Sequence, residues 1–152
     1  MGRRLACAVG MLAVLLWTCE RVRAEASWVG QPYVLSIPTH ITTCGQTVTG
    51  SIDLTINHDA FCWVHVDAAG AGQEVLKNGA ASLVTSYKIT GPSLWNGDAD
   101  WVGSTDFLSH SYLVLGSNPA DVVTLSVRAV APAGAAPEAG VYSAAIVLTA
   151  SW

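Results

Sequence analysis

The sequence predicts an all-β protein, an antiparallel β-sandwich of immunoglobulin-like type. Several segments alternate strictly between apolar and polar residues, which is the period of a half-buried strand. Turn-forming Gly, Pro, Asn and Asp residues separate these segments, and no segment shows a convincing 3.6-residue helical period. Seven or so short strands within about 125 residues are typical of such a sandwich.

The expected strands follow from this alternation. In the clearest example Ile52, Leu54 and Ile56 share one face, and the longest alternation runs from Tyr142 to Trp152. The segment 131–140 carries prolines and glycines and is predicted to be a loop. The expected strands cover residues 33–37, 51–57, 62–67, 83–90, 107–115, 123–129 and 142–152.

The composition excludes several classes of protein. Of the 152 residues 51% are hydrophobic and only 12% are charged, the reverse of the balance in a disordered chain. The net charge of −4, with only seven Lys plus Arg residues, argues against nucleic acid as a partner. No run of about 20 apolar residues occurs beyond the N-terminus, so no membrane span is expected in the mature chain. The length suits a single domain, expected over residues 25–152.

Residues 1–24 have the organisation of a secretory signal peptide. Two arginines precede an apolar run over residues 5–17, and small residues follow at Ala24 and Ala26. Cleavage is expected after Ala24, with cleavage after Ala26 as the alternative. Export through the Sec route would carry the mature chain to the periplasm and then to the cell surface, or secrete it.

Two cysteines, Cys44 and Cys62, remain once this leader is removed. An even number of cysteines in an oxidising compartment favours a disulfide, and two cysteines allow only one pairing. In the chain-entropy model, closing the loop between them stabilises the fold by about 3 kcal/mol. A structural disulfide between Cys44 and Cys62 is therefore expected.

Motifs for catalysis, cofactor binding or metal binding are missing from the sequence. It has no Gly-x-Ser-x-Gly elbow, no Cys-x-x-Cys pair and no phosphate-cradling glycine loop. His65 and Asp67 share one strand face, but no third ligand is spaced to close a metal site around them. Segment 96–100 is rich in oxygen ligands but lacks the closing Glu of a calcium loop. We expect a protein that is not an enzyme and that holds no cofactor or metal.

Tryptophan is frequent in the mature chain, and two interpretations are open. The side chains can pack in the core or on the sheets, or they can form an aromatic contact surface for a sugar or a neighbouring protein. Trp95 and Trp101 flank the turn at 96–100 and are the candidates for ligand contact. The five tryptophans stand at positions 28, 63, 95, 101 and 152.

Both ends of the mature chain are apolar. The arm at 25–37 carries Tyr33, Leu35 and Ile37 at alternate positions, and the last strand ends on Trp152 with no polar tail. An exposed sheet edge attracts a strand from another chain, and an apolar arm can be donated to such an edge by β-augmentation.

The C-terminal region resembles bacterial fimbrial subunits assembled by the chaperone–usher route, including the spore coat protein U-like family. The resemblance lies in the Ala-Gly-Val-Tyr turn at 139–142, followed by the alternating strand 143–152 that closes on an aromatic residue. The signal peptide, the early cysteine pair and the strands rich in Ser, Thr, Gly and Ala are also similar to that group.

The resemblance implies a non-enzymatic structural or adhesive subunit of a surface fimbria. Its sandwich would be incomplete and would be completed by a donated strand. A periplasmic chaperone, an outer-membrane usher and other pilin subunits would be its partners. The implied assembly interface comprises Tyr33, Leu35, Ile37, Tyr142, Ala144, Ile146, Leu148 and Trp152. Two alternatives stay open: a secreted monomeric module that binds carbohydrate or protein through Trp95 and Trp101, and a hydrolase.

Overall fold

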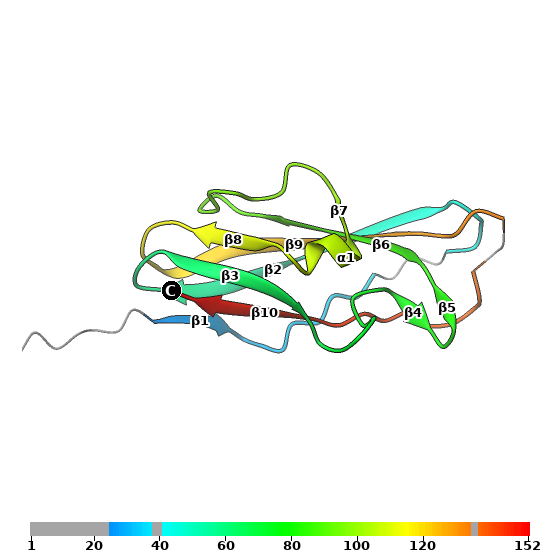
Figure 1. The fold of residues 1–152 in the computed structure, drawn as a ribbon, viewed down its shortest axis with the longest axis horizontal. Coiled ribbons are helices and arrows are strands. Elements are labelled where there is room, and N and C mark those ends of the chain that lie inside the picture. Colours follow the sequence, from blue (N-terminus) through cyan, green and yellow to red (C-terminus); the bar gives the residue numbers. More distant parts are fainter. Residues whose placement is uncertain (1–24, 38–40, 135–136) are drawn as a thin grey trace, which may run out of the picture.

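The computed structural model describes residues 25–37, 41–134 and 137–152. It confirms the all-β prediction, since strands hold 50% and helix 3% of the chain, mostly in antiparallel sheets. A five-stranded sheet has the order β1-β2-β9-β6-β7, and a three-stranded sheet has the order β10-β3-β8 (Figure 1). We call these the larger and the smaller sheet. The predicted signal peptide and its cleavage site at Ala24 lie outside the described residues.

The larger sheet contains β1 (Ala26–Val29), β2 (Thr47–His58), β6 (Val84–Thr90), β7 (Val102–Gly103) and β9 (Asn118–Val130). The smaller sheet contains β3 (Cys62–Ala68), β8 (Ser111–Val114) and β10 (Ile146–Ser151). A short hairpin joins β4 (Lys77–Asn78) to β5 (Ala81–Ser82), and α1 (Ser104–Phe107) is one helical turn.

The core lies between the two sheets and is built from the inward positions of their strands. The predicted inward residues of β3 and β9 are buried, as are Leu54 and Ile56 of β2, whereas Ile52 is partly buried. Ile56 and Val64 are fully buried. Opposite faces of the same strands carry Ser, Thr and other polar side chains, as the alternation predicts. Tyr87 and Phe107 stack at the centre with their ring centroids 4.8 Å apart.

Three predicted strands differ in the structure, and one of them, at 33–37, is absent. The segment 107–115 divides into α1 and β8, because Phe107 enters the core from a helical turn rather than from a strand. The last strand begins at Ile146 and not at Tyr142. Residues before it pair elsewhere, since Ser143 exchanges backbone hydrogen bonds with Lys77, and the Ala145 N–H donates to the Gln73 carbonyl.

The predicted disulfide is wrong for this structure, in which Cys44 and Cys62 are both free thiols. The reason is the length of β2, which covers 12 residues and lies entirely between the two cysteines. Such a strand places its ends roughly 35–40 Å apart, whereas the Cα atoms of a disulfide lie within about 7 Å.

Candidate assembly site

One edge of each sheet is incompletely paired, and these edges lie on the same side of the molecule. In the larger sheet β1 pairs only with Thr55–His58 of β2, which leaves the outer edge of β2 from Thr47 to Leu54 without a strand partner among the described residues. In the smaller sheet β10 is a terminal strand paired only with β3. We call the Thr47–Leu54 edge of β2 and the outer edge of β10 the open edges.

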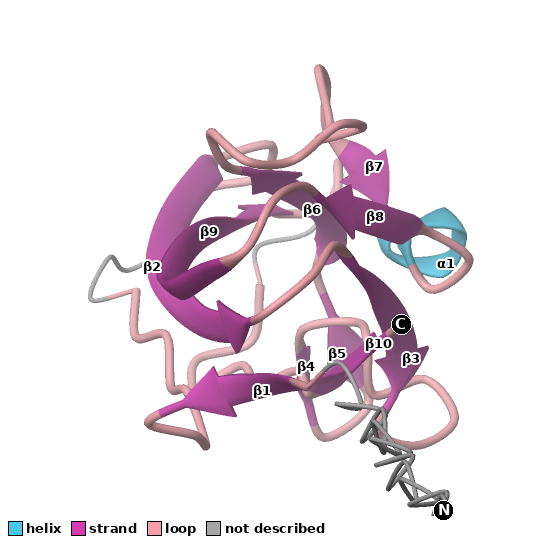
Figure 2. Ribbon diagram, turned by 90° about the vertical axis from the view of Figure 1, so that its left-hand side faces the viewer, coloured by secondary structure: helices cyan, strands magenta, loops and turns pink. Residues whose placement is uncertain are grey.

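The N-terminal arm, residues 25–37, lies along these edges. It runs antiparallel to β2, because Ala26 is opposite His58 and Ile37 reaches Gly50 farther back along the same strand. A Cβ atom at Gly50 would stand 2.6 Å from Cγ1 of Ile37, so the glycine makes room for the arm. Figure 2 shows β1 beside β10 at the side where the larger sheet ends.

The arm is held by side chains rather than by a long ladder. Tyr33, Leu35 and Ile37 are partly buried against the core, while Val34 between them is 79% exposed. The predicted strand at 33–37 is absent, and the backbone there makes no backbone–backbone hydrogen bond within the described part of the chain. Only the four residue pairs of β1 and β2 form a ladder in this region.

Two polar side chains fasten the arm to β2 and β10. The indole Nε1 of Trp28 donates a hydrogen bond of 2.9 Å to the Leu148 carbonyl of β10. The Tyr33 hydroxyl accepts a hydrogen bond from the Thr55 N–H at 3.0 Å and lies within donating distance of the Val29 carbonyl. The arm therefore bridges β2 and β10 across the side where the sandwich would otherwise be open.

On the β10 side, Ile146 and Leu148 have partly buried side chains that pack against the main core cluster. The Leu148 carbonyl points away from β3, since it accepts from Trp28. In an antiparallel strand the backbone groups of alternate residues face the same way, so those of Ile146, Leu148 and Ala150 face the open edge. The Leu148 carbonyl is occupied by Trp28, and the other groups face a side of β10 that has no strand partner among the described residues.

Six of the eight residues of the expected interface meet in two groups. Tyr33, Leu35, Ile146 and Leu148 pack against the main core cluster, and Ile37 and Tyr142 pack against a second cluster that includes Val48 and Leu83. The other two do not join them, since Ala144 is exposed before β10 begins and Trp152 is 61% exposed after it ends.

Trp95 and Trp101, the two expected ligand contacts, are not brought together. Trp101 lies on the larger sheet, where the Arg128 guanidinium stands 5.0 Å from its ring centroid in a cation–π contact. Trp95 lies beside the smaller sheet, where its N–H donates to the Leu113 carbonyl, and its side chain is 74% exposed.

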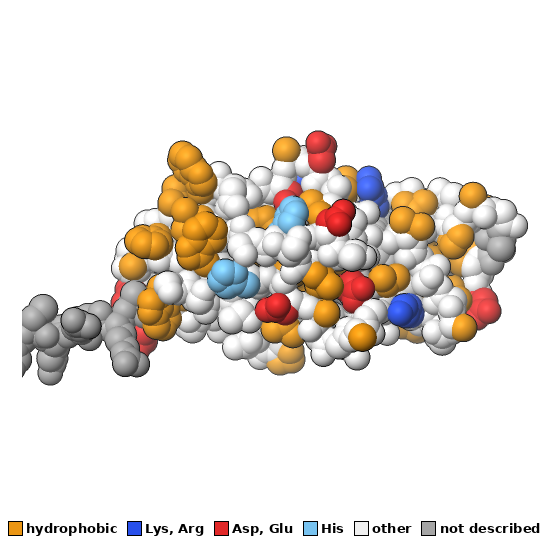
Figure 3. Space-filling model, viewed as in Figure 1, with side chains coloured by type: hydrophobic (Ala, Val, Ile, Leu, Met, Phe, Trp, Pro, Cys, Tyr) orange, Lys and Arg blue, Asp and Glu red, His pale blue; other side chains and the backbone are white. Residues whose placement is uncertain are grey.

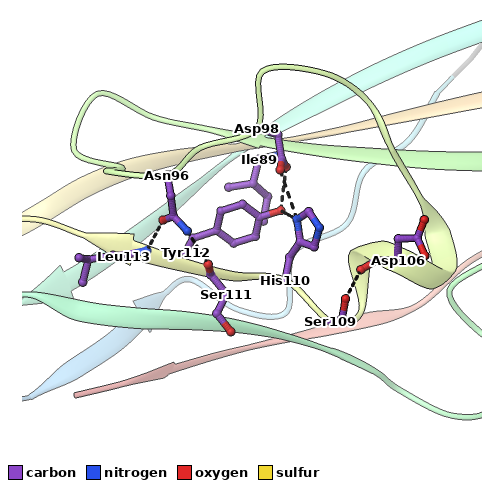
Figure 4. A network of polar contacts seen from close by, with 9 residues as sticks. All are labelled: Ile89, Asn96, Asp98, Asp106, Ser109, His110, Ser111, Tyr112 and Leu113. Carbon is purple, nitrogen blue, oxygen red and sulfur yellow. Dashed lines mark hydrogen bonds and ion pairs between the residues drawn. The ribbon is translucent and has the colours of Figure 1, made fainter.

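A polar network fixes the loop that carries Trp95 (Figure 4). The Asp98 carboxylate accepts hydrogen bonds of 2.7 Å from the Tyr112 hydroxyl and from the Ile89 N–H. Nδ1 of His110 lies 3.4 Å from the other carboxylate oxygen of Asp98. Burial, together with the bond to Asp98, raises the pKa of Tyr112 above its ordinary value. The network ties the loop to β6 and β8.

A second network is closed to ligands. Nδ1 of His58 lies 2.9 Å from the Ala60 carbonyl, and Nε2 lies 3.0 Å from the Asp121 carboxylate, so both ring nitrogens are engaged within the protein. Ser93 donates to Asp121 rather than to His58, which is not the order of a nucleophile, base and orienting acid. The His58 side chain is fully buried.

Neither metal ligation nor a membrane helix is indicated for the part of the chain that is described. Residues 25–37, 41–134 and 137–152 contain no group of three or more His, Cys, Asp or Glu side chains that could hold a metal ion. No helix within the same ranges is long and apolar enough to cross a membrane.

Comparison with known proteins gives no family for this chain. No family model matches it, and a search of curated proteins finds no relative.

Proposed function

We propose that this protein is an exported, non-enzymatic structural or adhesive subunit of a bacterial surface fimbria, and that it assembles by strand donation. The observation that carries the proposal is the placement of the N-terminal arm on the two open edges. The arm lies where a strand is missing. It is held there by apolar side chains and by a ladder of only four residue pairs, not by a full strand. The resemblance of residues 139–152 to chaperone–usher subunits supports the same proposal.

The arm of one copy can be exchanged for the arm of another. A segment that is fastened mainly by inserted side chains can be replaced by the same segment from another copy, because every contact is then reproduced between chains. The backbone groups of Ile146 and Ala150, which face the open edge of β10, would gain hydrogen bonds if the incoming arm formed a full strand. Tyr33, Leu35 and Ile37 would be the donated side chains.

The proposal includes further partners. A periplasmic chaperone would cover the open edges before assembly, and an outer-membrane usher would pass the subunit to the cell surface. Residues 1–24 would act as the signal peptide. The excess of acidic over basic residues gives the subunit no basic surface for nucleic acid.

The test compares two neighbouring arm positions that point in opposite directions. Leu35→Asp places a charge where the arm packs on the core, and Val34→Asp places the same charge on the solvent side. We expect Leu35→Asp to abolish polymers of the purified full chain and Val34→Asp to leave them intact, as measured by size-exclusion chromatography and electron microscopy. A synthetic peptide of residues 25–37 should bind the Leu35→Asp protein and raise its melting temperature.

A different set of results would favour the alternative function. If the wild type and both variants are stable monomers and the peptide does not bind, the arm is a permanent part of its own domain. The chain would then be a complete monomeric module.

A further inference from the structure

The outer face of the smaller sheet carries a row of apolar side chains that the core does not use. Trp63 of β3 is directly opposite Leu113 of β8. On the other side of β8, an isolated bridge between Leu94 and Val114 places Trp95 opposite Leu113. Residues directly opposite each other in antiparallel strands project to the same face. Trp63, Leu113 and Trp95 therefore form one row across β3, β8 and the segment bridged to β8 at Leu94, which we call the aromatic row.

Burial of the neighbouring residues shows that the side chains of this row point away from the core. Cys62, Val64 and Val114, which flank the row along β3 and β8, are buried in the core. By alternation Trp63 and Leu113 point outward, and Trp63 is 37% and Trp95 is 74% exposed. Two strand spacings separate the tryptophans, so their backbones lie roughly 10 Å apart. Figure 3 shows apolar side chains gathered at the end of the molecule where β8 ends.

Trp95 is held firmly in place although its ring is exposed. Its own N–H donates to the Leu113 carbonyl at 2.9 Å. The side chain of Asn96 accepts from the Leu113 N–H at 2.7 Å and donates to the Ser111 carbonyl at 2.8 Å (Figure 4). On the other side of the row, the Leu115 N–H donates to the Ser93 carbonyl at 2.8 Å. An aromatic ring on a fixed backbone loses little conformational freedom on binding a ligand.

Uncharged hydroxyl groups border the row. His65, on the same outer face, lies between two hydroxyls, with Nδ1 at 2.8 Å from Ser111 and Nε2 at 3.0 Å from Ser151. Three basic residues lie in the described ranges: Lys88 donates to the Ala99 carbonyl, Arg128 stacks on Trp101, and Lys77 lies in β4, outside the larger and the smaller sheet. The face thus offers flat rings and hydroxyls without positive charge, which suits a neutral ligand and not an anionic one.

We propose that the aromatic row binds a neutral, extended oligosaccharide. Sugar rings present C–H faces that stack on tryptophan, and their hydroxyls can bond with the hydroxyl groups of Ser111 and Ser151, which His65 holds in place. A second copy of the chain fits this face less well. Two tryptophans and a leucine bury a few hundred Å² at most, which is less than the ~800 Å² that each partner contributes to a standard protein interface.

The test titrates the purified full-chain protein with neutral hexasaccharides of β-linked glucose and of N-acetylglucosamine, following tryptophan fluorescence and calorimetric heat. We expect saturable binding of at least one of them, weakened about tenfold or more by Trp95→Ala and by Trp63→Ala. Trp152→Ala is the matched control, because Trp152 is also exposed but lies outside the row, and it should bind like the wild type. Melting temperatures of all variants identify any that fail to fold.

The inference would be overturned if neither hexasaccharide binds, or if the folded Trp63→Ala and Trp95→Ala variants bind as tightly as the wild type. Tighter binding of a heparin fragment than of the neutral sugars would also contradict it. The aromatic row lies away from the arm, so the Leu35→Asp variant should bind sugar normally. Loss of polymers and loss of sugar binding are therefore separate outcomes.

Discussion

At the scale of single residues, the two cysteines have very different surroundings. Cys62 is 1% exposed at the start of β3, and burial raises the pKa of its thiol, with the negative charge of Asp121 adding to the effect. Cys44 is exposed before β2 begins. Since the thiolate is the reactive form, a buried thiol with a raised pKa reacts slowly.

We predict that, in protein lacking residues 1–24, a thiol reagent such as dithionitrobenzoate modifies one cysteine per folded chain rapidly. The second should react only after unfolding in denaturant. The Cys44→Ser variant should lose the rapid reaction and keep the slow one. If no thiol reacts even in the unfolded protein, the cysteines are joined and the separation imposed by β2 is incorrect.

Sequence reasoning identified the inward residues well but not their partners. The buried positions of β2, β3 and β9 follow from alternation, which is a local property. The contact between Arg128 and Trp101 and the pairing of His58 with Asp121, which are 63 positions apart, depend on which strands lie side by side. No local signal marks such pairs. The sequence alone therefore could not distinguish a Trp101 that contacts a ligand from a Trp101 that packs against Arg128.

At the scale of elements, the arm and β2 depend on each other at Gly50. A side chain there would meet Cγ1 of Ile37 at 2.6 Å and Cδ1 of Leu35 at 3.5 Å. We predict that Gly50→Val displaces the arm and destabilises the fold by about 1–3 kcal/mol. Hydrogen exchange of the β1 amides, the part of the arm that pairs with β2, should accelerate.

Ser51→Val is the control for this prediction, because residue 51 is exposed on the opposite face of the same strand. Both changes introduce valine, which favours strands, so only the contact with the arm distinguishes them. Equal exchange in the two variants would show that Ile37 does not occupy the space at Gly50.

The sequence predicts the bounds of some strands closely and the existence of others wrongly. Strands with strict alternation and clear turns, such as β3 and β6, agree with the sequence to within one or two residues. Residues 33–37 of the arm were expected as a strand and are not one, because their side chains are inserted while their backbone stays unpaired. Alternation reports which face is buried, but it does not report whether the backbone finds a partner.

At the scale of the whole molecule, one buried aromatic centre joins the two sheets. Tyr87 of the larger sheet stacks on Phe107, which also contacts Tyr112 of the smaller sheet at a centroid distance of 6.3 Å. Burial, with the nearby negative charge of Glu74, raises the pKa of Tyr87 from 10.0 to about 12. The neutral phenol is therefore the form that the folded state favours.

This shift predicts the alkaline limit of stability. A phenol whose pKa is raised on folding contributes fully below pH 10, and its contribution is lost as the pH rises from 10 to 12. We expect the free energy of unfolding to fall by about 3 kcal/mol across that range because of Tyr87 alone. Denaturant melts at several pH values would measure it.

Tyr87→Phe is the control for the alkaline prediction. It removes the titrating group together with the hydrogen bond from the Tyr87 hydroxyl to the Glu74 carbonyl. The variant should be less stable at neutral pH but should lose less stability between pH 10 and 12. An unchanged slope would mean that Tyr87 does not ionise with unfolding.

The sequence by itself determined that the protein is all-β and which side chains face its core. The two-residue alternation of apolar and polar side chains is a local property that each strand shows separately. The tertiary structure decided how the strands pair, and therefore where the sheets are left open. It placed Trp28 against Leu148, 120 positions away, so that the arm bridges both edges. It also placed the two cysteines at opposite ends of β2, and it set Trp63 and Trp95 in one row. These arrangements depend on contacts between segments that are distant in the sequence. The free energies of such contacts cannot be inferred from a local sequence pattern.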